Sequence, residues 1–88
     1  MSYQVLLHPS AAKELEKIDS RERVRILERL RELRDEPKIG KTLRHSSFWS
    51  LRAGDYRAIY EIDWESRRVI VLFIGHRSSV YEDFSKLF

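Results

Sequence analysis

Near Lys41 the hydrophobic period of this chain changes from that of a helix to that of a strand, and this change constrains the fold more than any other feature. Before it, Ala11, Leu15 and Ile18 recur at the i, i+4 and i+7 spacing that places them on one face of a helix. After it, apolar residues tend to alternate with polar ones, as in half-buried strands. Helices first and strands later favour an α+β domain, with a helix hairpin packed on one face of a small, mostly antiparallel sheet.

The N-terminal part is predicted to form one strand and two helices. Tyr3–His8 forms a short strand, Pro9 ends it because proline cannot donate to a ladder, and Ser10 is expected to cap the first helix. The second helix should begin at the capping box Asp19–Glu22 and run to about Asp35. The short junction between the helices predicts that they are antiparallel.

The C-terminal part is predicted to form a sheet and one more helix. We expect strands over Phe48–Arg52, Tyr56–Ile62 and Val69–Ile74, with the last strand central because it is apolar on both faces. A short helix over 79–88 would place Val80, Phe84 and Leu87 on one face. The predicted core is Leu15, Ile18, Leu27, Leu30, Val69, Val71 and Phe73.

Length and composition narrow the class of protein. The chain has 88 residues, which predicts a single domain over 1–88. The sequence contains no cysteine, which excludes disulfides and cysteine-ligated metals. The N-terminus does not resemble a signal peptide, and the longest apolar run, Val69–Ile74, is far short of a bilayer span, so we expect a cytoplasmic protein without a membrane partner. Abundant charge with few Asn and Gln is typical of thermophile proteins, although a chain this short also reaches it by chance.

The net charge of +3 is concentrated in one segment. Up to Pro37, eight basic residues balance eight acidic ones, whereas five basic residues between Lys38 and Arg57 face one acid, Asp55. Such a patch is expected of a protein that binds a polyanion, because Lys and Arg displace counterions from phosphates. A solvated basic surface explains the same charges equally well.

Arginines at strand positions are the main candidates for chemistry. Arg57 lies inside a predicted strand, Arg52 ends the strand before it, and Arg77 directly follows the apolar strand. A single such arginine is most simply explained by an ion pair with Glu61 or Asp55. Several that converge with too few acids instead predict a phosphate site, since a guanidinium holds phosphate with two parallel hydrogen bonds. The sequence shows neither a glycine-rich phosphate loop nor histidines or acids at metal-ligand spacing, and we expect no cofactor and no metal.

Two segments resemble the RelE/ParE toxin superfamily. Leu51–Asp63 reads LRAGDYRAIYEID and Ile74–Phe84 reads IGHRSSVYEDF, similar to the L-R-x-G-x-Y-R-x-x-Y and G-H-R-x-x-V-Y segments of its members. The opening also resembles the family, with Pro9 followed by the Lys13–Leu15 segment, so the likeness covers essentially the whole chain. It implies a type II toxin held inactive by a short, RelB-like antitoxin.

The RelE branch, which we favour, cuts messenger RNA on the ribosome without a metal. The resemblance places Arg57 and Arg77 at arginines that stabilise charge on the phosphate, and Tyr81 at a tyrosine able to stack on a base. Arginine stays protonated, so it can hold that charge but cannot act as the base. Lys41, Arg44 and Arg52 are expected to bind flanking phosphates of the RNA.

One departure leaves the general base open. Well-studied RelE members carry lysines at alternate positions of the strand before the turn, where this chain has Phe48 and Ser50. His76, His45 and Tyr81 remain as candidates; His76 suits the role because histidine titrates near neutral pH, yet it fits a structural role as well.

Two rivals to the nuclease share its scaffold. The missing lysines favour a ParE-like inhibitor of DNA gyrase that has no catalysis, whereas the retained Arg57, Arg77 and Tyr81 favour the nuclease. The other rival is a non-toxic module that binds RNA or protein.

Overall fold

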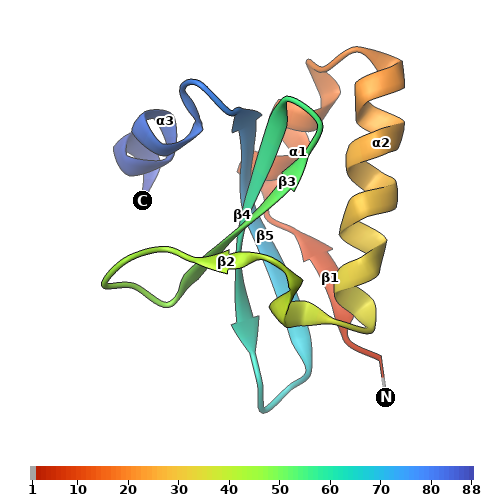
Figure 1. Ribbon diagram of the computed structural model, residues 1–88, viewed down its shortest axis with the longest axis vertical. Helices are drawn as coiled ribbons and strands as arrows, with labels where there is room; N and C mark the ends of the chain where they lie inside the picture. The colour runs from red at the N-terminus through yellow and green to blue at the C-terminus, as the bar shows by residue number, and fades with distance from the viewer. Residues whose placement is uncertain (1) are drawn as a thin grey trace.

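The computed structural model describes residues 2–88 and contains one five-stranded sheet with three α-helices (Figure 1). The strands are β1 (Gln4–Leu7), β2 (Lys41–Thr42), β3 (Phe48–Ala53), β4 (Tyr56–Asp63) and β5 (Arg68–His76). The helices are α1 (Pro9–Glu16), α2 (Ser20–Arg31) and α3 (Val80–Leu87), with short 3-10 helices at Glu32–Arg34 and Pro37–Ile39. Among the described residues, no helix is long and apolar enough to cross a membrane.

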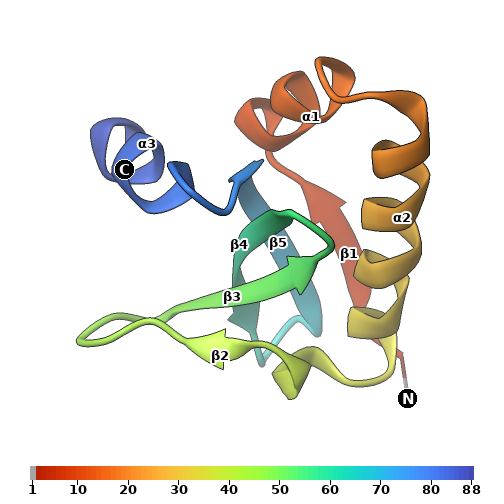
Figure 2. The ribbon, with the colours of Figure 1, turned by 45° about the horizontal axis from the view of Figure 1, so that its top comes forward.

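The sheet has the strand order β1-β5-β4-β3-β2, so β5 and β4 lie at its centre. β1 pairs with β5 in parallel, and every other pair is antiparallel. The mostly antiparallel α+β architecture predicted from the sequence is therefore confirmed. β2 is a two-residue edge strand, and the hairpin that joins it to β3 projects away from the sheet (Figure 2).

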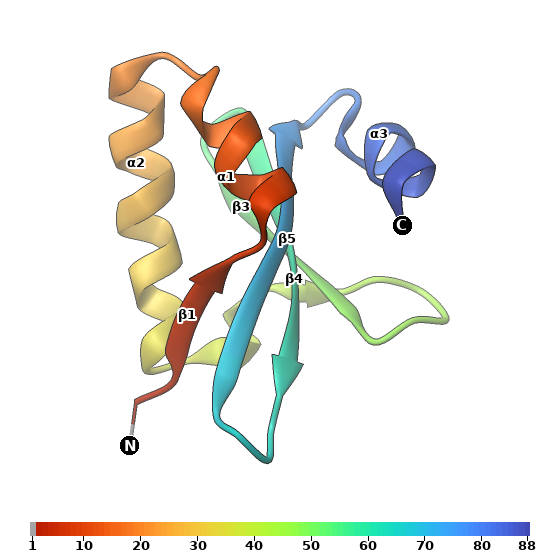
Figure 3. The same cartoon turned by 180° about the vertical axis from the view of Figure 1, so that it is seen from behind.

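The α1–α2 hairpin covers one face of the sheet and builds the larger core (Figure 3). Leu15, Ile18 and Leu30 are buried there, as predicted. Leu27 was expected to join them, but it is 39% exposed. The buried face of α2 contains Ile26 and Leu30, and Leu27 falls at its margin, one position past Ile26.

Two helix boundaries differ from the prediction. The cap of α1 is His8 rather than Ser10: the His8 ring accepts the Ser10 N–H at 3.1 Å, and Pro9 takes the first helical position. The Ser10 hydroxyl instead donates to the Leu72 carbonyl and ties the helix to β5. The α2 helix ends at Arg31, and the last turn before Asp35 tightens into the 3-10 form.

A bulge in β5 divides its apolar residues between two cores. Tyr60 pairs with Val71 and Ile59 with Phe73, so one extra residue, Leu72, interrupts the alternation. Val71 therefore packs under the helix hairpin, whereas Phe73 faces the opposite side with Ile59. The sequence predicted that both are buried, which is confirmed, but a strict period of two would have placed them on one face.

Helix α3 packs on that opposite face of the sheet. Val80 and Phe84 are buried against Ile59, Leu72 and Phe73. The third residue of the predicted stripe, Leu87, is the last residue of α3 and is instead 59% exposed.

Candidate active site

The candidate catalytic residues meet in one open pocket at the end of the sheet where α3 begins. Its volume is about 510 Å³. It is lined by Arg52, Arg57, His76, Arg77, Ser78 and Tyr81. The four predicted catalytic residues and one of the three predicted RNA-binding residues therefore lie together, although they come from three strands or strand ends and one helix.

Arg52 and Arg57 are placed by the β3–β4 hairpin. They are direct cross-strand partners, so both side chains leave the sheet on the α3 side. The turn between them needs Gly54, whose φ of +63° is in the left-handed region, and the Arg52 Nε donates to the Gly54 carbonyl at 3.0 Å. From the other face, Arg29 Nε donates to the Arg52 carbonyl at 3.1 Å, which ties this hairpin to α2.

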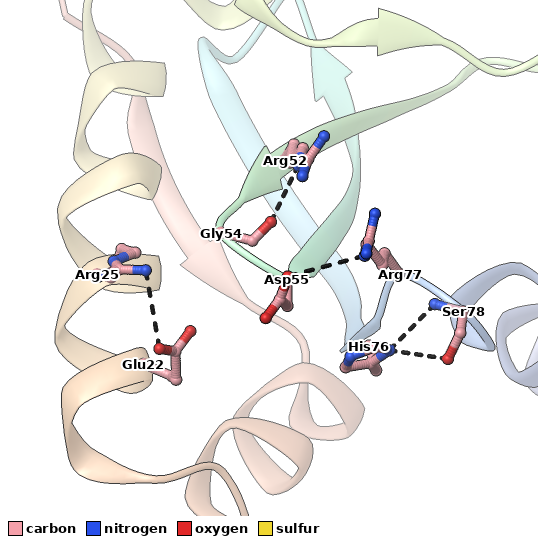
Figure 4. A network of polar contacts seen from close by, with 8 residues as sticks. All are labelled: Glu22, Arg25, Arg52, Gly54, Asp55, His76, Arg77 and Ser78. Atoms are coloured by element: carbon pink, nitrogen blue, oxygen red, sulfur yellow. Dashed lines mark hydrogen bonds and ion pairs between the residues drawn. The ribbon is translucent and has the colours of Figure 1, made fainter.

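Arg77 is held by its backbone more than by its charge. Its N–H donates to the Asp55 carbonyl at 2.8 Å, which joins the end of β5 to the β3–β4 turn. The guanidinium Nε lies 3.7 Å from Asp55 Oδ1, and both side chains are more than half exposed (Figure 4). An ion pair this long and this exposed contributes little. The guanidinium is thus available to an anionic ligand.

Arg57 is half-buried and has no carboxylate within ion-pair distance among residues 2–88. The simpler interpretation of the sequence, an ion pair with Glu61 or Asp55, is therefore wrong for Arg57, while Asp55 does approach Arg77. The polar contact of the Arg57 guanidinium is to Ser50 Oγ, at 3.4 Å. A half-buried cation without a counterion favours an anion beside it.

Tyr81 stands on the first turn of α3 with 43% of its surface exposed. Its hydroxyl lies 3.0 Å from Ser50 Oγ, so the ring is anchored at its polar end. The exposed ring is available to stack on a base.

His76 is arranged as a hydrogen-bond donor to the pocket. Its Nδ1 accepts the Ser78 N–H at 3.2 Å and lies 2.8 Å from the Ser78 hydroxyl (Figure 4). A backbone N–H can only donate, so the neutral ring must carry its proton on Nε2. The ring also packs edge-on against Tyr56, with centroids 5.6 Å apart. This tautomer leaves no free lone pair on Nε2 to take a proton from a substrate.

The remaining predicted RNA-binding residues lie outside the pocket. Lys41 pairs with Ser50 across β2 and β3, so its exposed side chain leaves the sheet on the pocket's side. Arg44 is exposed at the turn of the projecting β2–β3 hairpin. His45, in the same turn, adopts a positive φ of 58° and is likewise absent from the pocket.

The sequence predicted no structural role for two serines that contact residues of the pocket. Ser78 supports His76, and Ser50 contacts both Arg57 and Tyr81. Ser50 could have been noticed because it lies two residues before Arg52 and therefore on the same face of the strand. Nothing in the sequence marks Ser78 except that it lies two residues after His76. Among the described residues, no group of three or more His, Asp or Glu side chains is placed to hold a metal ion.

A model of the family described as the ParE toxin of the type II toxin–antitoxin system parDE matches residues 5–81. The chain belongs to this toxin family. Toxin RelG of Mycobacterium tuberculosis is 34% identical over 85 residues, which cover 92% of this chain and 98% of RelG.

Solved structures place the toxin beside RelE proteins. The toxin–antitoxin complex RelBE2 of M. tuberculosis matches with a TM-score of 0.82 and 33% identity, over 88% of this chain and 100% of the matched one. The isolated RelE toxin of E. coli matches with a TM-score of 0.75 and 28% identity, over 98% of each chain. Membership of the RelE/ParE superfamily, expected from the sequence motifs, is thus confirmed.

In this toxin, the two positions expected to carry lysines are occupied by residues that hold α3 on the sheet. Phe48 packs edge-on against Phe84, with ring centroids 5.1 Å apart. Ser50 is 2% exposed and contacts Tyr81. An ammonium group at Ser50 would have to displace α3 or remain buried beside Arg57 without a counterion, which is costly.

Proposed function

We propose that this toxin is a ribonuclease that cuts messenger RNA on the ribosome, with no metal ion in the reaction. The convergence of Arg52, Arg57 and Arg77 on one pocket, opposed by a single exposed carboxylate, carries this proposal. The resemblance to RelE proteins supplies the reaction, and the pocket's chemistry agrees with it.

The proposed reaction is attack of a 2′-hydroxyl on the adjacent phosphate, with cleavage of the bond to the 5′-oxygen. The 2′-hydroxyl gives its proton to solvent water, and the leaving 5′-oxygen takes a proton from water to become a hydroxyl. Negative charge grows on the non-bridging oxygens as the phosphorus becomes five-coordinate. Arg57 and Arg77 would hold these oxygens, and their positions are set in advance by the sheet and by the Asp55 carbonyl. Tyr81 would stack on the neighbouring base, while Lys41, Arg44 and Arg52 bind flanking phosphates.

His76 serves this reaction best as a donor. With its proton on Nε2, it can hydrogen-bond a phosphate oxygen, whereas accepting the 2′-hydroxyl proton would require the other tautomer and the loss of the Ser78 N–H bond. We therefore assign the arginines the main effect on the rate and give His76 a supporting role.

The decisive experiment uses ribosomes programmed with a defined message. Wild-type toxin should cut within the A-site codon, and the upstream fragment should end in a 2′,3′-cyclic phosphate or a 3′-phosphate. A message with 2′-deoxynucleotides in that codon should resist cleavage, because its nucleophile is missing. Cleavage of the deoxy message, or an upstream fragment ending in a 3′-hydroxyl, would point to an activated water and refute the mechanism.

The second candidate is a ParE-like inhibitor of DNA gyrase without catalysis. It is favoured by the family model's description and by Phe48 and Ser50, which replace the expected lysines. The same wild-type protein should be added to a gyrase supercoiling assay. Growth arrest with intact messenger and failed supercoiling would replace the nuclease with this function.

We further propose a RelB-like antitoxin as the partner in the cytoplasm. The RelBE2 structure of M. tuberculosis is a toxin–antitoxin complex, and that of Pyrococcus horikoshii is a RelE–RelB complex. Helix α3 borders the pocket, so an antitoxin segment that competes with it would disturb Tyr81 as well. Hydrogen exchange of the toxin with and without antitoxin should change in 79–88 and in the basic strands; unchanged protection there would contradict this site of inhibition.

A further inference from the structure

Ser50 is the one serine, threonine or charged residue that is buried among residues 2–88. It lies on β3, beneath the start of α3 and between Phe48 and Arg52 on the same face. A buried hydroxyl is costly unless it finds partners. Both partners of Ser50 are residues of the pocket: Arg57 on β4 and Tyr81 on α3.

The chemistry of the groups fixes the direction of the Arg57–Ser50 hydrogen bond, whereas either hydroxyl can be the donor between Ser50 and Tyr81. The Arg57 guanidinium can only donate, so Ser50 Oγ accepts from its Nη1 over 3.4 Å. The Ser50 O–H is then free to donate to the Tyr81 oxygen, 3.0 Å away. When Ser50 is the donor, the proton of Tyr81 points away from Ser50 and is available to a ligand in the pocket.

We propose that Ser50 is a positioning residue of the active site, which holds the Arg57 guanidinium and the Tyr81 phenol in one fixed arrangement toward a phosphodiester. This inference rests on the proposed ribonuclease function and deepens it. In this arrangement Ser50 donates to Tyr81, so Tyr81 becomes a hydrogen-bond donor to a phosphate oxygen in addition to a surface for a base. Ser50, at a position where a lysine was expected, would thus contribute to catalysis without carrying a charge.

The test is single-turnover cleavage on programmed ribosomes by four variants at the two positions. Ser50→Ala, Ser50→Cys and Tyr81→Phe should each lower the maximal rate by roughly 10–100-fold, as slight misplacement of a catalytic group does, with little change in the half-saturating concentration. Cysteine preserves the volume of serine but is a weak donor, so it separates the hydroxyl from packing. Ser50→Thr keeps the hydroxyl and should restore most of the rate. Ser20→Ala makes the same chemical change at an exposed position of α2 and should leave the rate unaltered.

A double-mutant cycle shows whether the two residues act through one bond. The Ser50→Ala/Tyr81→Phe variant should be slowed by clearly less than the product of the two single effects, because the substitutions share the Ser50–Tyr81 contact, while each also removes one of its own, to Arg57 or to the phosphate. Multiplied effects would overturn the proposal, as would a wild-type rate in Ser50→Ala. The melting temperature of each variant identifies any that fails to fold.

An NMR measurement tests the Ser50–Tyr81 contact independently of the ribonuclease function. The ¹³Cζ resonance of Tyr81 senses hydrogen bonding at its oxygen, so Ser50→Ala should shift it and Ser50→Thr should largely restore it. An unchanged resonance in Ser50→Ala overturns the Ser50–Tyr81 contact itself. If wild-type toxin cuts no message, the ribonuclease function fails and the catalytic role of Ser50 fails with it. If wild type cuts and Ser50→Ala cuts equally well, the role of Ser50 alone is overturned.

Discussion

Arg52 and Arg57 stand directly opposite each other across the β3–β4 hairpin, and both guanidinium groups line the same pocket. Like charges in this position destabilise a sheet, so the folded toxin carries a repulsion that a bound phosphate would relieve. The arrangement favours ligand binding over stability and is the clearest mark of a functional site on this surface.

Removing the charge of Arg52 should therefore stabilise the free toxin. We expect Arg52→Gln to raise the free energy of unfolding by about 0.2–1 kcal/mol at low ionic strength. This increase in stability should become smaller at high salt, because salt screens the repulsion between Arg52 and Arg57. Denaturant unfolding at two salt concentrations measures it. Arg68→Gln is the matched control: Arg68 lies opposite Asp63, so removing its charge should slightly lower stability.

The arginines should dominate the rate of cleavage. Arg57→Ala and Arg77→Ala should each slow it by roughly 10²–10³-fold, as the loss of a preorganised donor does. Lys41→Ala, outside the pocket, should mainly weaken binding and make its salt dependence shallower. Arg68→Ala, at the far end of β5, controls for the lost positive charge. Cleavage rates of the arginine variants close to wild type would contradict the assignment of the pocket.

His76→Ala should lower stability without abolishing catalysis. The Ser78 N–H loses its acceptor and Tyr56 loses an aromatic neighbour, so the melting temperature should fall. The cleavage rate of the folded fraction should fall less than in Arg57→Ala or Arg77→Ala, because His76 is a neutral donor that supports the arginines and is not the base. His76→Asn retains an acceptor for the Ser78 N–H and should recover part of the stability. A complete loss of cleavage in well-folded His76→Asn would show that the ring is the base.

Leu30 and Leu27 give a matched test of the face that α2 buries. Leu30 is 4% exposed and Leu27 is 39% exposed. Leu30→Ala should lower the free energy of unfolding by roughly 2–5 kcal/mol, because it leaves a cavity in the core. Leu27→Ala should cost far less, since solvent already reaches that side chain. Equal losses in chemical denaturation would mean that the helix face is assigned wrongly.

Leu27 shows that the spacing of apolar residues does not predict which residues at the border of a helix face are buried. The spacing of apolar residues predicted α2 and most of its buried face, but Leu27 lies at the border of that face, where the neighbouring layer decides burial. The Leu72 bulge is a similar case: no local signal in the apolar run Val69–Ile74 shows where the alternation will break. Pairing with β4 determines it, which is a long-range property.

The residues of the candidate site were easier to predict from the sequence than the burial of Leu27 or the position of the bulge. Strand ends and a turn place Arg52, Arg57 and Arg77 at one end of a sheet, and their motifs marked them in the sequence. Ser50 was missed because its role depends on α3 folding back over β3, a contact between residues 31 positions apart. His8 was missed as a helix cap because its side chain is a rarer cap than that of serine, which follows two residues later.

Tyr60 links the helical half of the chain to the sheet and should make the toxin sensitive to alkali. It is fully buried; its hydroxyl donates to the Pro37 carbonyl at 2.7 Å and accepts the Gly40 N–H at 3.2 Å. Gly40 is needed there, because a Cβ would lie 2.6 Å from both the Tyr60 hydroxyl and the Ser50 carbonyl. Tyr60→Phe leaves the carbonyl and the N–H without this partner and should cost about 1–3 kcal/mol of the free energy of unfolding at neutral pH.

The dependence of this cost on pH follows from the pKa of Tyr60. Burial raises the pKa of the Tyr60 hydroxyl above its ordinary value of 10.0, since the phenolate is poorly solvated inside the protein. Below pH 10 both the folded and the unfolded chain hold the proton, so the contribution of Tyr60 is fully present. As the pH rises from 10 through the higher pKa of the folded state, only the unfolded chain ionises at first, and wild-type stability falls. Phenylalanine cannot ionise, so the stability difference between wild type and Tyr60→Phe should narrow with rising pH. Urea unfolding of both proteins from pH 8 to pH 11 measures this difference; a constant gap would mean that the Tyr60 hydroxyl is not buried as the structure has it.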